Sequence, residues 1–462
     1  MNQGRLPPAL SEQIPTRFTQ AGALRFWVAA ILTGVATGIG AIALTRLLEL
    51  VQHWLWPGNS LLEAASSASA HRIVLTLLGA GVVVIVGQLL LKQLTSGNGI
   101  DTTAAIWFHA GRLPALRTLG SAILSVIIVG MGVSMGREGA PKQAGAVFAN
   151  FFADRIRLSE EQRRLLVACG AGAGMGAAYG VPLGGAIFSL EVMRGVLALR
   201  YVLPAILVSA VATGVSWLGL PNAKTYEVPH YTARAMACLF ALVAGPVAGV
   251  MSVAYVHLIT WAERHKPEGW RKFVEPLLVM GALGAAAIWY PQLLGNGKDV
   301  SQLAFVGEVG AGLALVLFFL KPAATGMCMQ SGAPGGLFTP SLTFGAMLGA
   351  VLGHGWAMMT PGLPVGLCAL LGASAVIAAT TQGPISAIVL MMELTGRDRS
   401  FALPMLLAVT TATMVSRTIT PRSIYDARLT DEEFEERRAA REVRPGQSPV
   451  PDSPLETQQN SN

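Results

Sequence analysis

The stretch that decides the fold is residues 322–392, which read PAATGMCMQSGAPGGLFTPSLTFGAMLGAVLGHGWAMMTPGLPVGLCALLGASAVIAATTQGPISAIVLMM. It contains no Asp, Glu, Lys or Arg, whereas one helix that crosses a membrane needs only about 20 apolar residues. A transmembrane β-barrel would instead show short segments of alternating polarity. Residues 201–223 form a second charge-free run. The chain is therefore predicted to be an all-α polytopic membrane protein.

The composition supports this prediction and excludes other classes. Hydrophobic residues make up 52% of the chain and charged residues 13%, about half of the ~25% that is usual in soluble domains. The net charge of +7 is not gathered into a basic face, so it indicates membrane orientation rather than a nucleic-acid partner. The histidines and cysteines show no metal-ligand spacing. We expect contact with membrane lipid, no nucleic acid, no metal and no cofactor.

An internal repeat suggests the domain organisation. Three glycine-led segments recur in the same order 198, 200 and 202 residues later: Gly97–Asp101 as Gly295–Asp299, Gly136–Ala140 as Gly336–Pro340, and Gly170–Pro182 as Gly372–Pro384. In both copies a glutamate follows nine residues after the last proline, as Glu191 and Glu393. We interpret this pair as structural, at helix ends, rather than as an acid/base pair.

The repeat divides the chain into four parts. Residues 1–21 are a polar N-terminal tail, residues 22–220 and 221–425 are two membrane repeats, and residues 426–462 are a charged cytoplasmic tail. We expect the tail to contain a short charged helix followed by disorder. Transporters often combine such repeats in inverted orientation and bind their substrate between them, at the ends of broken helices.

The segment GREG at residues 136–139 is the first candidate site. It lies between two apolar stretches, so it places the ionisable Glu138 at membrane depth, where such groups are costly and usually functional. Adjacent residues of a helix do not face each other, so Arg137 is a poor local partner. Helix starts carry free N–H groups that bind anions. Three glycine-led starts, near residues 98, 137 and 337, are expected to converge on one anion.

These motifs together resemble the CLC family of chloride channels and anion/proton antiporters. Gly136–Ala140 matches the family's GREGP motif except at the last position, and Gly336–Pro340 is similar to its G-x-F-x-P motif. Ala178–Leu183 resembles the segment before the helices of the family's dimer interface, and Ser423–Tyr425 resembles the segment with the pore-lining tyrosine. The resemblance covers roughly residues 22–425 and implies the family's inverted-repeat fold of tilted and broken helices.

The resemblance also implies roles for single residues. Glu138 would be the gating glutamate, whose carboxylate occupies the anion site as a tethered competitor. Backbone amides would donate to the anion, and the tyrosine would line the inner side of the central site. The implied protein is a homodimer with one pore per subunit. The implied anion-binding residues are Asn98, Gly99, Arg137, Gly139, Leu337, Phe338 and Tyr425.

The sequence departs from the family pattern at three positions. Asn98 replaces the serine that coordinates the anion, although an amide NH2 can still donate. Asp101 replaces a proline; we expect it to cap a helix and to point away from the anion. Val192 replaces the inner glutamate that follows the position of Glu191 in coupled exchangers, and valine cannot carry a proton.

Three functions follow, in order of preference. The first is transport of chloride or a similar small anion through a pore gated by Glu138, as a chloride channel because Val192 removes the proton site. The second is a fluoride/proton antiporter of the same family, which Asn98 together with Val192 keeps open. The third, an intramembrane enzyme, would need catalytic groups where residues 322–392 offer only His354; we expect no enzymatic activity. We expect a multi-pass protein of the bacterial inner membrane.

Overall fold

Long apolar helices dominate the computed structural model, which describes residues 14–15, 22–58, 60–94, 100–231, 235–396 and 401–442. The residues so described form helices and a single isolated β-bridge, so the predicted all-α class is confirmed. Within them, eight helices are long and apolar enough to cross a membrane: α1 (Ala23–Leu55), α3 (Ala70–Leu94), α9 (Leu199–Ser216), α10 (Ala235–Arg264), α11 (Arg271–Trp289), α13 (Ala311–Gln330), α14 (Phe338–Met359) and α17 (Ala402–Ile419).

The other helices are shorter or carry polar ends. They are α2 (Leu61–Ser67), α4 (Thr102–Phe108), α5 (Ala115–Gly130), α6 (Gly139–Ile156), α7 (Glu160–Tyr179), α8 (Pro182–Phe188), α12 (Lys298–Val306), α15 (Val365–Thr381), α16 (Pro384–Thr395) and α18 (Asp431–Glu442). A π-helix, η2 (Ser189–Arg194), continues α8, and two 3₁₀ turns are η3 (Pro291–Leu293) and η4 (Ile424–Arg428). Proline occupies the first position of α8 and α16, where its missing N–H costs nothing.

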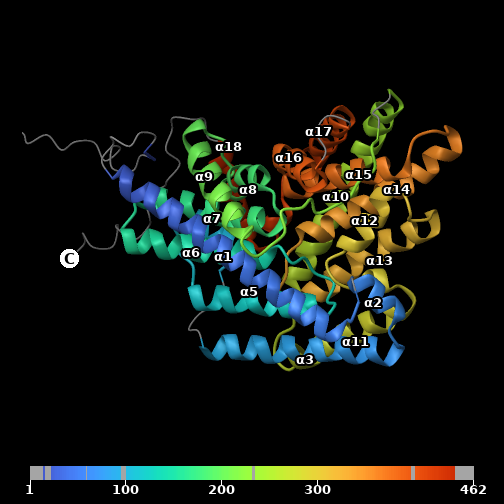
Figure 1. Ribbon diagram of the computed structural model, residues 1–462, viewed down its shortest axis with the longest axis horizontal. Coiled ribbons are helices and arrows are strands. Elements are labelled where there is room, and N and C mark those ends of the chain that lie inside the picture. The colour runs from blue at the N-terminus through green and yellow to red at the C-terminus, as the bar shows by residue number, and fades with distance from the viewer. Residues whose placement is uncertain are drawn as a thin grey trace, which may run out of the picture. The chain divides into compact units, whose positions relative to one another are not determined.

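The helices of the second half repeat the order of the first. The order of helices α10 to α17 matches the order of α1 and α3 to α9, so that α10 corresponds to α1 and α17 to α9. Equivalent pairs also pack together. The packing of α6 on α7 corresponds to that of α14 on α15, and the packing of α1 on α9 corresponds to that of α10 on α17. The two halves also contact each other directly. Figure 1 shows α3 and α11 side by side along the lower edge of the view, where they pack together.

Glycine–glycine contacts let equivalent helices cross closely. A Cβ atom added to Gly145 of α6 would overlap the carbonyl oxygen of Gly170 on α7, and one added to Gly345 of α14 would lie 2.6 Å from the oxygen of Gly372 on α15. Small residues permit such backbone contact inside membranes, where packing drives helix association. The glycine-rich segment from Gly170 therefore serves helix packing.

The two repeated glutamates cap helices of the opposite half. The carboxylate of Glu191 accepts hydrogen bonds from the N–H groups of Ile385 (3.2 Å) and Ser386 (2.6 Å) at the start of α16. The carboxylate of Glu393 accepts from the N–H groups of Leu183 (3.1 Å) and Gly184 (2.6 Å) at the start of α8. These contacts agree with the expected helix-end role.

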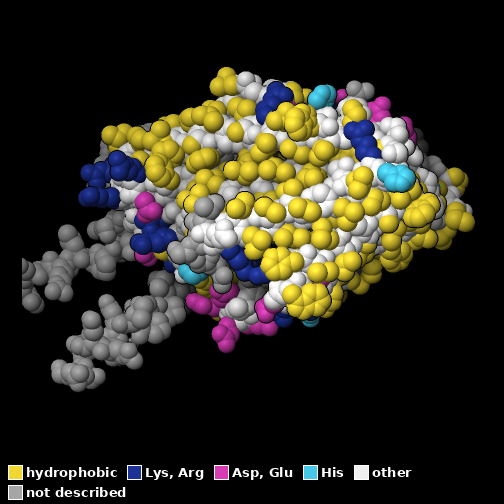
Figure 2. Space-filling view, turned by 90° about the horizontal axis from the view of Figure 1, so that it is seen from below, with side chains coloured by type: hydrophobic (Ala, Val, Ile, Leu, Met, Phe, Trp, Pro, Cys, Tyr) yellow, Lys and Arg dark blue, Asp and Glu magenta, His cyan; other side chains and the backbone are white. Residues whose placement is uncertain are grey.

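Apolar side chains also cover the surface. Figure 2 shows them across most of the face seen from below, where α3 and α11 lie. Exposed members on these helices include Leu75 (66% exposed), Leu90 (49%) and Leu278 (66%). Monomeric soluble proteins rarely expose such continuous apolar areas, so this face is suited to lipid.

The chain after Arg428 forms a separate unit. Helix α18 lies in it and begins with three acidic residues, which favour a helix N-terminus. Thr430 and Glu433 exchange side chain to backbone hydrogen bonds in a capping box. The short charged helix expected after residue 426 is thus present, whereas the expected disorder concerns residues 443–462, which lie outside the described residues.

Candidate functional site

The candidate site is built on the meeting of two repeat-equivalent glycines. The N–H of Gly136 donates to the oxygen of Gly336 (2.8 Å), and the N–H of Gly336 donates to the oxygen of Gly136 (2.7 Å). The bridge is antiparallel, as expected if a two-fold axis relates the two segments. It places the N-termini of α6 and α14 next to each other, so two of the three predicted glycine-led starts do converge.

Glu138 sits at this junction with its carboxylate on the N-terminus of α14. Its Oε1 accepts hydrogen bonds from the backbone N–H groups of Phe338 (2.6 Å) and Thr339 (3.3 Å), and its Oε2 accepts from the Thr339 hydroxyl (3.1 Å). The residue is only 3% exposed. Free amides and the helix dipole stabilise negative charge at such a position, so the same donors could hold a small anion.

Two further side chains complete the surroundings of the carboxylate. The Tyr179 hydroxyl lies 3.4 Å from Oε2 of Glu138 and 2.9 Å from the Thr339 hydroxyl oxygen. The guanidinium of Arg137 lies over the Tyr179 ring, 4.8 Å from its centroid. Arg137 thus stacks on Tyr179, in line with the expectation that it makes no local pair with Glu138.

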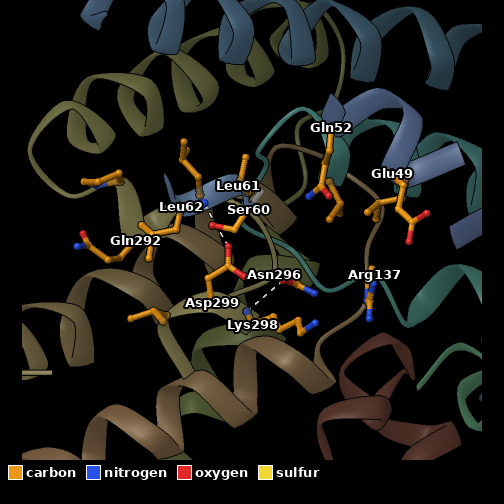
Figure 3. Close-up of a pocket in the computed structure, with 16 residues that line it drawn as sticks. Glu49, Gln52, Ser60, Leu61, Leu62, Arg137, Gln292, Asn296, Lys298 and Asp299 are labelled. Atoms are coloured by element: carbon orange, nitrogen blue, oxygen red, sulfur yellow. Dashed lines mark hydrogen bonds between the residues drawn. The ribbon is translucent and has the colours of Figure 1, made fainter. Parts of the chain in front are cut away.

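On one side, Arg137 borders a cavity of about 260 Å³, here called the Arg137 cavity (Figure 3). Its charged and amide lining residues are Glu49, Gln52, Arg137, Gln292, Asn296, Lys298 and Asp299. The N–H of Leu62 donates to Asp299 (3.2 Å) and that of Lys298 to Asn296 (3.1 Å). Burial lowers the pKa of Lys298, and the nearby charge of Arg137 lowers it further. The cavity therefore brings charges of both signs close to the Glu138 segment.

Elsewhere in the site, Tyr425 lies close to the helix of Glu138. Its ring packs edge-on against Phe188 at 5.6 Å, and the ammonium of Lys142 lies 4.5 Å from its centroid. Lys142 lies in the first turn of α6, four residues after the N-cap residue Glu138, and its backbone N–H donates to the backbone oxygen of Glu138 (3.3 Å). The tyrosine that the sequence singled out is thus linked to the Glu138 helix through a lysine.

Asp101 caps α4, as predicted. Its Oδ1 accepts from the Thr103 N–H (2.7 Å), and its Oδ2 lies 3.1 Å from Nη1 of Arg428. Burial alone would raise the pKa of the Asp101 carboxyl, but the charges of Lys142 and Arg428 outweigh burial and lower it. Asp101 therefore stays ionised beside these cations.

A known family matches most of the chain. The sequence model of the family described as voltage gated chloride channel matches residues 78–417. The chain belongs to this family, the CLC family. It is accordingly a multi-pass membrane protein of a family of channels and transporters.

Curated CLC relatives are about one third identical. An H(+)/Cl(-) exchange transporter of Vibrio cholerae is 31% identical over 314 residues, which are 65% of this chain and 66% of that protein's length. A putative chloride channel protein of Ralstonia nicotianae is 31% identical over 413 residues, 85% of this chain and 94% of that one. A voltage-gated ClC-type chloride channel of Citrobacter koseri is 31% identical over 86% of this chain and 97% of its own.

Solved CLC structures share the fold. A slow cyanobacterial Cl-/H+ antiporter superimposes with a TM-score of 0.77 at 22% identity, over 90% of this chain and 99% of that chain. A CLC-type fluoride/proton antiporter superimposes with a TM-score of 0.70 at the same identity and coverage. At this level of identity the likeness concerns the fold alone.

Some of the residues expected to bind the anion in this CLC chain lie at the junction of α6 and α14. The amides that reach the Glu138 carboxylate are those of Phe338 and Thr339, and Leu337 precedes Phe338 as the N-cap residue of α14. The roles of Leu337 and Phe338 toward the anion stay a prediction. Gly139 opens α6 in close contact with the other half, since a Cβ atom there would lie 2.9 Å from the Gly336 nitrogen. Asn98 and Gly99 lie outside the described residues.

Val192, the position expected to carry a proton in coupled exchangers, is buried in η2. The Val192 side chain packs closely against Gly383, the residue before α16. A Cβ atom added to Gly383 would lie 2.6 Å from Cγ2 of Val192.

Three residues near Glu138 were not predicted from the sequence: Thr339, Tyr179 and Lys142. The first two lie inside the quoted motifs, and the third is a cation four residues after Glu138. Over the described part of the chain, no three His, Cys, Asp or Glu side chains gather to hold a metal ion.

Proposed function

We propose that this CLC-family chain moves a small monovalent anion, chloride in the first place, across a bacterial inner membrane along a path gated by Glu138. The observation that carries the proposal is the buried Glu138 carboxylate on the N–H groups of Phe338 and Thr339. A carboxylate has the charge of a halide and accepts from the same donors. An anion can therefore replace it when the side chain is protonated or swings away.

The relatives support chloride as the substrate. The Vibrio cholerae relative is named as an H(+)/Cl(-) exchange transporter, and the Citrobacter koseri relative is named as a chloride channel. In this proposal the protein binds and releases an ion without a chemical step, so it is not an enzyme.

Passive conduction is proposed over exchange for protons. An exchanger needs an ionisable group on the proton path, and the buried Val192 offers none at the position where coupled relatives are expected to have one.

The second candidate function is fluoride/proton antiport. A specific observation favours it: three donors within 3.3 Å surround the Glu138 carboxylate, and the strongly hydrated fluoride ion would need donors of this kind in place of its water.

The same proposal covers the assembly. Residues 22–220 and 221–425 form the two repeats of one pore, residues 1–21 are a polar N-terminal tail, residues 426–462 are a charged cytoplasmic tail, and two copies form a homodimer with one pore each. Support comes from α8 and α16, which pack together and expose Leu183 (51% exposed) and Ile385 (47%). Such an apolar face suits a second copy.

Flux from purified protein in liposomes tests the function. An outward chloride gradient and then a fluoride gradient are imposed, while anion release and internal pH are recorded together. Fast chloride release without proton movement that reverses with voltage is the expected result. Fluoride-selective release that pumps protons would transfer the protein to the second candidate, and release no faster than from protein-free liposomes would refute both.

A further inference from the structure

Arg428 ends the 3₁₀ turn η4, in which Tyr425 is the second residue. A 3₁₀ helix has three residues per turn, so side chains three residues apart lie one above the other. Tyr425 and Arg428 therefore share one face of η4. A turn of only five residues gains little stability from its own hydrogen bonds, so its place in the protein depends on contacts with other segments.

The Arg428 guanidinium contacts one carboxylate from each half of the chain. Its Nη1 donates to Oδ2 of Asp101 (3.1 Å), the N-cap residue of α4, and its Nε lies 3.4 Å from Oε2 of Glu263, near the end of α10. Only 28% of the Arg428 side chain is exposed, against 11% for Asp101 and 15% for Glu263. Because partly buried ion pairs are screened less than surface pairs, these contacts fix the end of η4 against both α4 and α10.

The start of η4 is shaped by contacts within the turn itself. The backbone N–H and the hydroxyl of Ser423 donate to Oδ2 of Asp426 (2.9 Å and 2.7 Å). These hydrogen bonds join residues three apart, so they form the turn but do not place it against the helices. The Tyr425 ring packs edge-on against Phe188, a contact without charge. The charged contacts that place the turn come from its last residue.

The arginine and the aspartate suit each other in this contact. A guanidinium presents its N–H donors as a planar fork and can reach two carboxylates at once, whereas a lysine ammonium is a single point charge. Asp101 stands where the CLC motif has a proline, whose side chain could accept nothing from Arg428. The link between η4 and α4 is therefore a feature of this chain rather than of the family motif.

Resting on the proposed function, we propose that Arg428 is a positioning residue for anion transport, whose ion pairs with Asp101 and Glu263 hold Tyr425 at the inner side of the anion path. Arg428 does not touch the anion in this arrangement. It fixes the tyrosine beforehand, so the ring does not have to be ordered each time an anion enters. Because such preorganisation raises affinity, loss of Arg428 should weaken the hold on the anion.

Flux from liposomes at a series of chloride concentrations tests this role. Arg428→Gln should raise the half-saturating chloride concentration about two- to tenfold, the effect of having to order one side chain on binding. Arg428→Lys keeps the charge but loses the fork, so its value should lie in between. A merely structural role would reduce the amount of active protein, and with it the maximal flux, at an unchanged half-saturating concentration.

Arg163→Gln is the matched control. Arg163 is also buried and also pairs with a carboxylate, that of Asp154, but it joins α7 to α6. Its loss should lower the unfolding temperature in detergent and leave the half-saturating chloride concentration unchanged. An equal rise of that concentration in Arg163→Gln would show that loss of any such ion pair suffices, and would overturn the proposal.

The two carboxylates provide a second test. In Arg428→Gln, Asp101 still caps α4 and Glu263 still pairs with Lys266, so the variant should fold. Asp101→Asn and Glu263→Gln each remove one contact, so each should raise the half-saturating chloride concentration by less than Arg428→Gln does. Asp101→Asn added to Arg428→Gln should change little, because one ion pair cannot be lost twice. Effects that add in full would show that Asp101 acts without Arg428 and would contradict the proposal.

A label on tyrosine separates this proposal from the proposed transport. Fluorotyrosine replaces the seven tyrosines, and the ¹⁹F NMR signal of Tyr425 is identified by its loss in Tyr425→Phe. The signal should shift or broaden in Arg428→Gln and stay unchanged in Arg163→Gln. If the unchanged protein releases no anion but the signal responds in this way, transport fails and the positioning of Tyr425 stands.

The remaining outcomes count against the positioning role alone. If chloride is transported and Arg428→Gln changes neither the signal nor the half-saturating concentration, transport stands and Arg428 does not position Tyr425. A signal that moves while the half-saturating concentration stays the same would show that Arg428 holds Tyr425 without any effect on transport, and the proposal would be wrong.

Discussion

The backbone N–H of Phe338 donates a 2.6 Å hydrogen bond to Oε1 of Glu138, which belongs to the other half of the chain. The contact joins the first turn of α14 to the residue that precedes α6. Amide groups that the fold holds in place stabilise the negative charge there. In the proposed function, the side chain competes with an anion for these amides.

Glu138→Ala should remove this competitor. We expect anion affinity at the freed amides to rise about tenfold, because a hydrogen-bonded charged group no longer has to be displaced. Anion flux from liposomes should rise, since no carboxylate occupies the N–H groups of Phe338 and Thr339. Glu308→Ala removes an exposed carboxylate as a control. Flux through Glu138→Ala that is no faster than through the unchanged protein would contradict the gating role.

The reciprocal caps predict unequal losses of stability. Glu191 accepts from two backbone N–H groups and also from the Ser386 hydroxyl (2.7 Å), whereas Glu393 accepts from two N–H groups only. Glu191→Ala should therefore cost more than Glu393→Ala, about 2 kcal/mol against about 1 kcal/mol. Thermal unfolding in detergent measures both.

A single further variant checks the origin of the difference. Ser386→Ala, made with Glu191 left in place, should remove only the hydroxyl contact to the glutamate. Its loss of stability should account for most of the gap between the two glutamate variants. Equal losses for Glu191→Ala and Glu393→Ala would show that the hydroxyl contributes nothing.

Much of the fold can be predicted from local chemistry. Charge-free runs reveal the membrane class, and the repeated glycines and prolines mark helix starts, so Pro182 and Pro384 do open α8 and α16. The short helices α2 and α12 do not stand out in the hydropathy pattern, although Ser60 and Glu63 form a start signal for α2. Helices of seven and nine residues gain their stability from tertiary packing rather than from their own sequence.

The details of the site can be predicted only in part. Glu138 stands out because a lone carboxylate in an apolar stretch is costly. The amides that meet it depend on the register of the Gly136–Gly336 bridge, a tertiary contact that selects the donors Phe338 and Thr339. The contact between Lys142 and Tyr425 likewise joins segments far apart in the sequence, which no local pattern reveals.

Two glycines should respond in opposite directions to alanine. In Gly170→Ala the new methyl group would collide with the Gly145 oxygen and lie 2.9 Å from the Ala149 Cβ. Overpacking of this kind costs about 1–3 kcal/mol. Gly214 of α9 has nothing within 4 Å of the position that a Cβ atom would take, so Gly214→Ala should stabilise by up to about 1 kcal/mol through helix propensity. Opposite shifts of the unfolding temperature in detergent are expected. Equal shifts would contradict the close crossing of α6 and α7.

The ion pair of Asp101 predicts a loss of stability in acid. Burial opposes the effect, but the charges of Lys142 and Arg428 still lower the pKa of Asp101 below its ordinary value of 3.8. The folded protein therefore binds this proton less readily than the unfolded chain. The stabilisation is complete above the ordinary pKa and disappears as the pH falls through the folded value.

Asp101→Asn should reveal that contribution. Asparagine keeps the helix cap but loses the attraction to the two cations, so the variant should be less stable by about 1 kcal/mol at pH 7. Unfolding temperatures of both proteins in detergent, measured from pH 7 down to below pH 4, should converge at the acid end as Asp101 becomes protonated. A difference that stays constant over this range would show that the carboxylate gains nothing from Lys142 and Arg428.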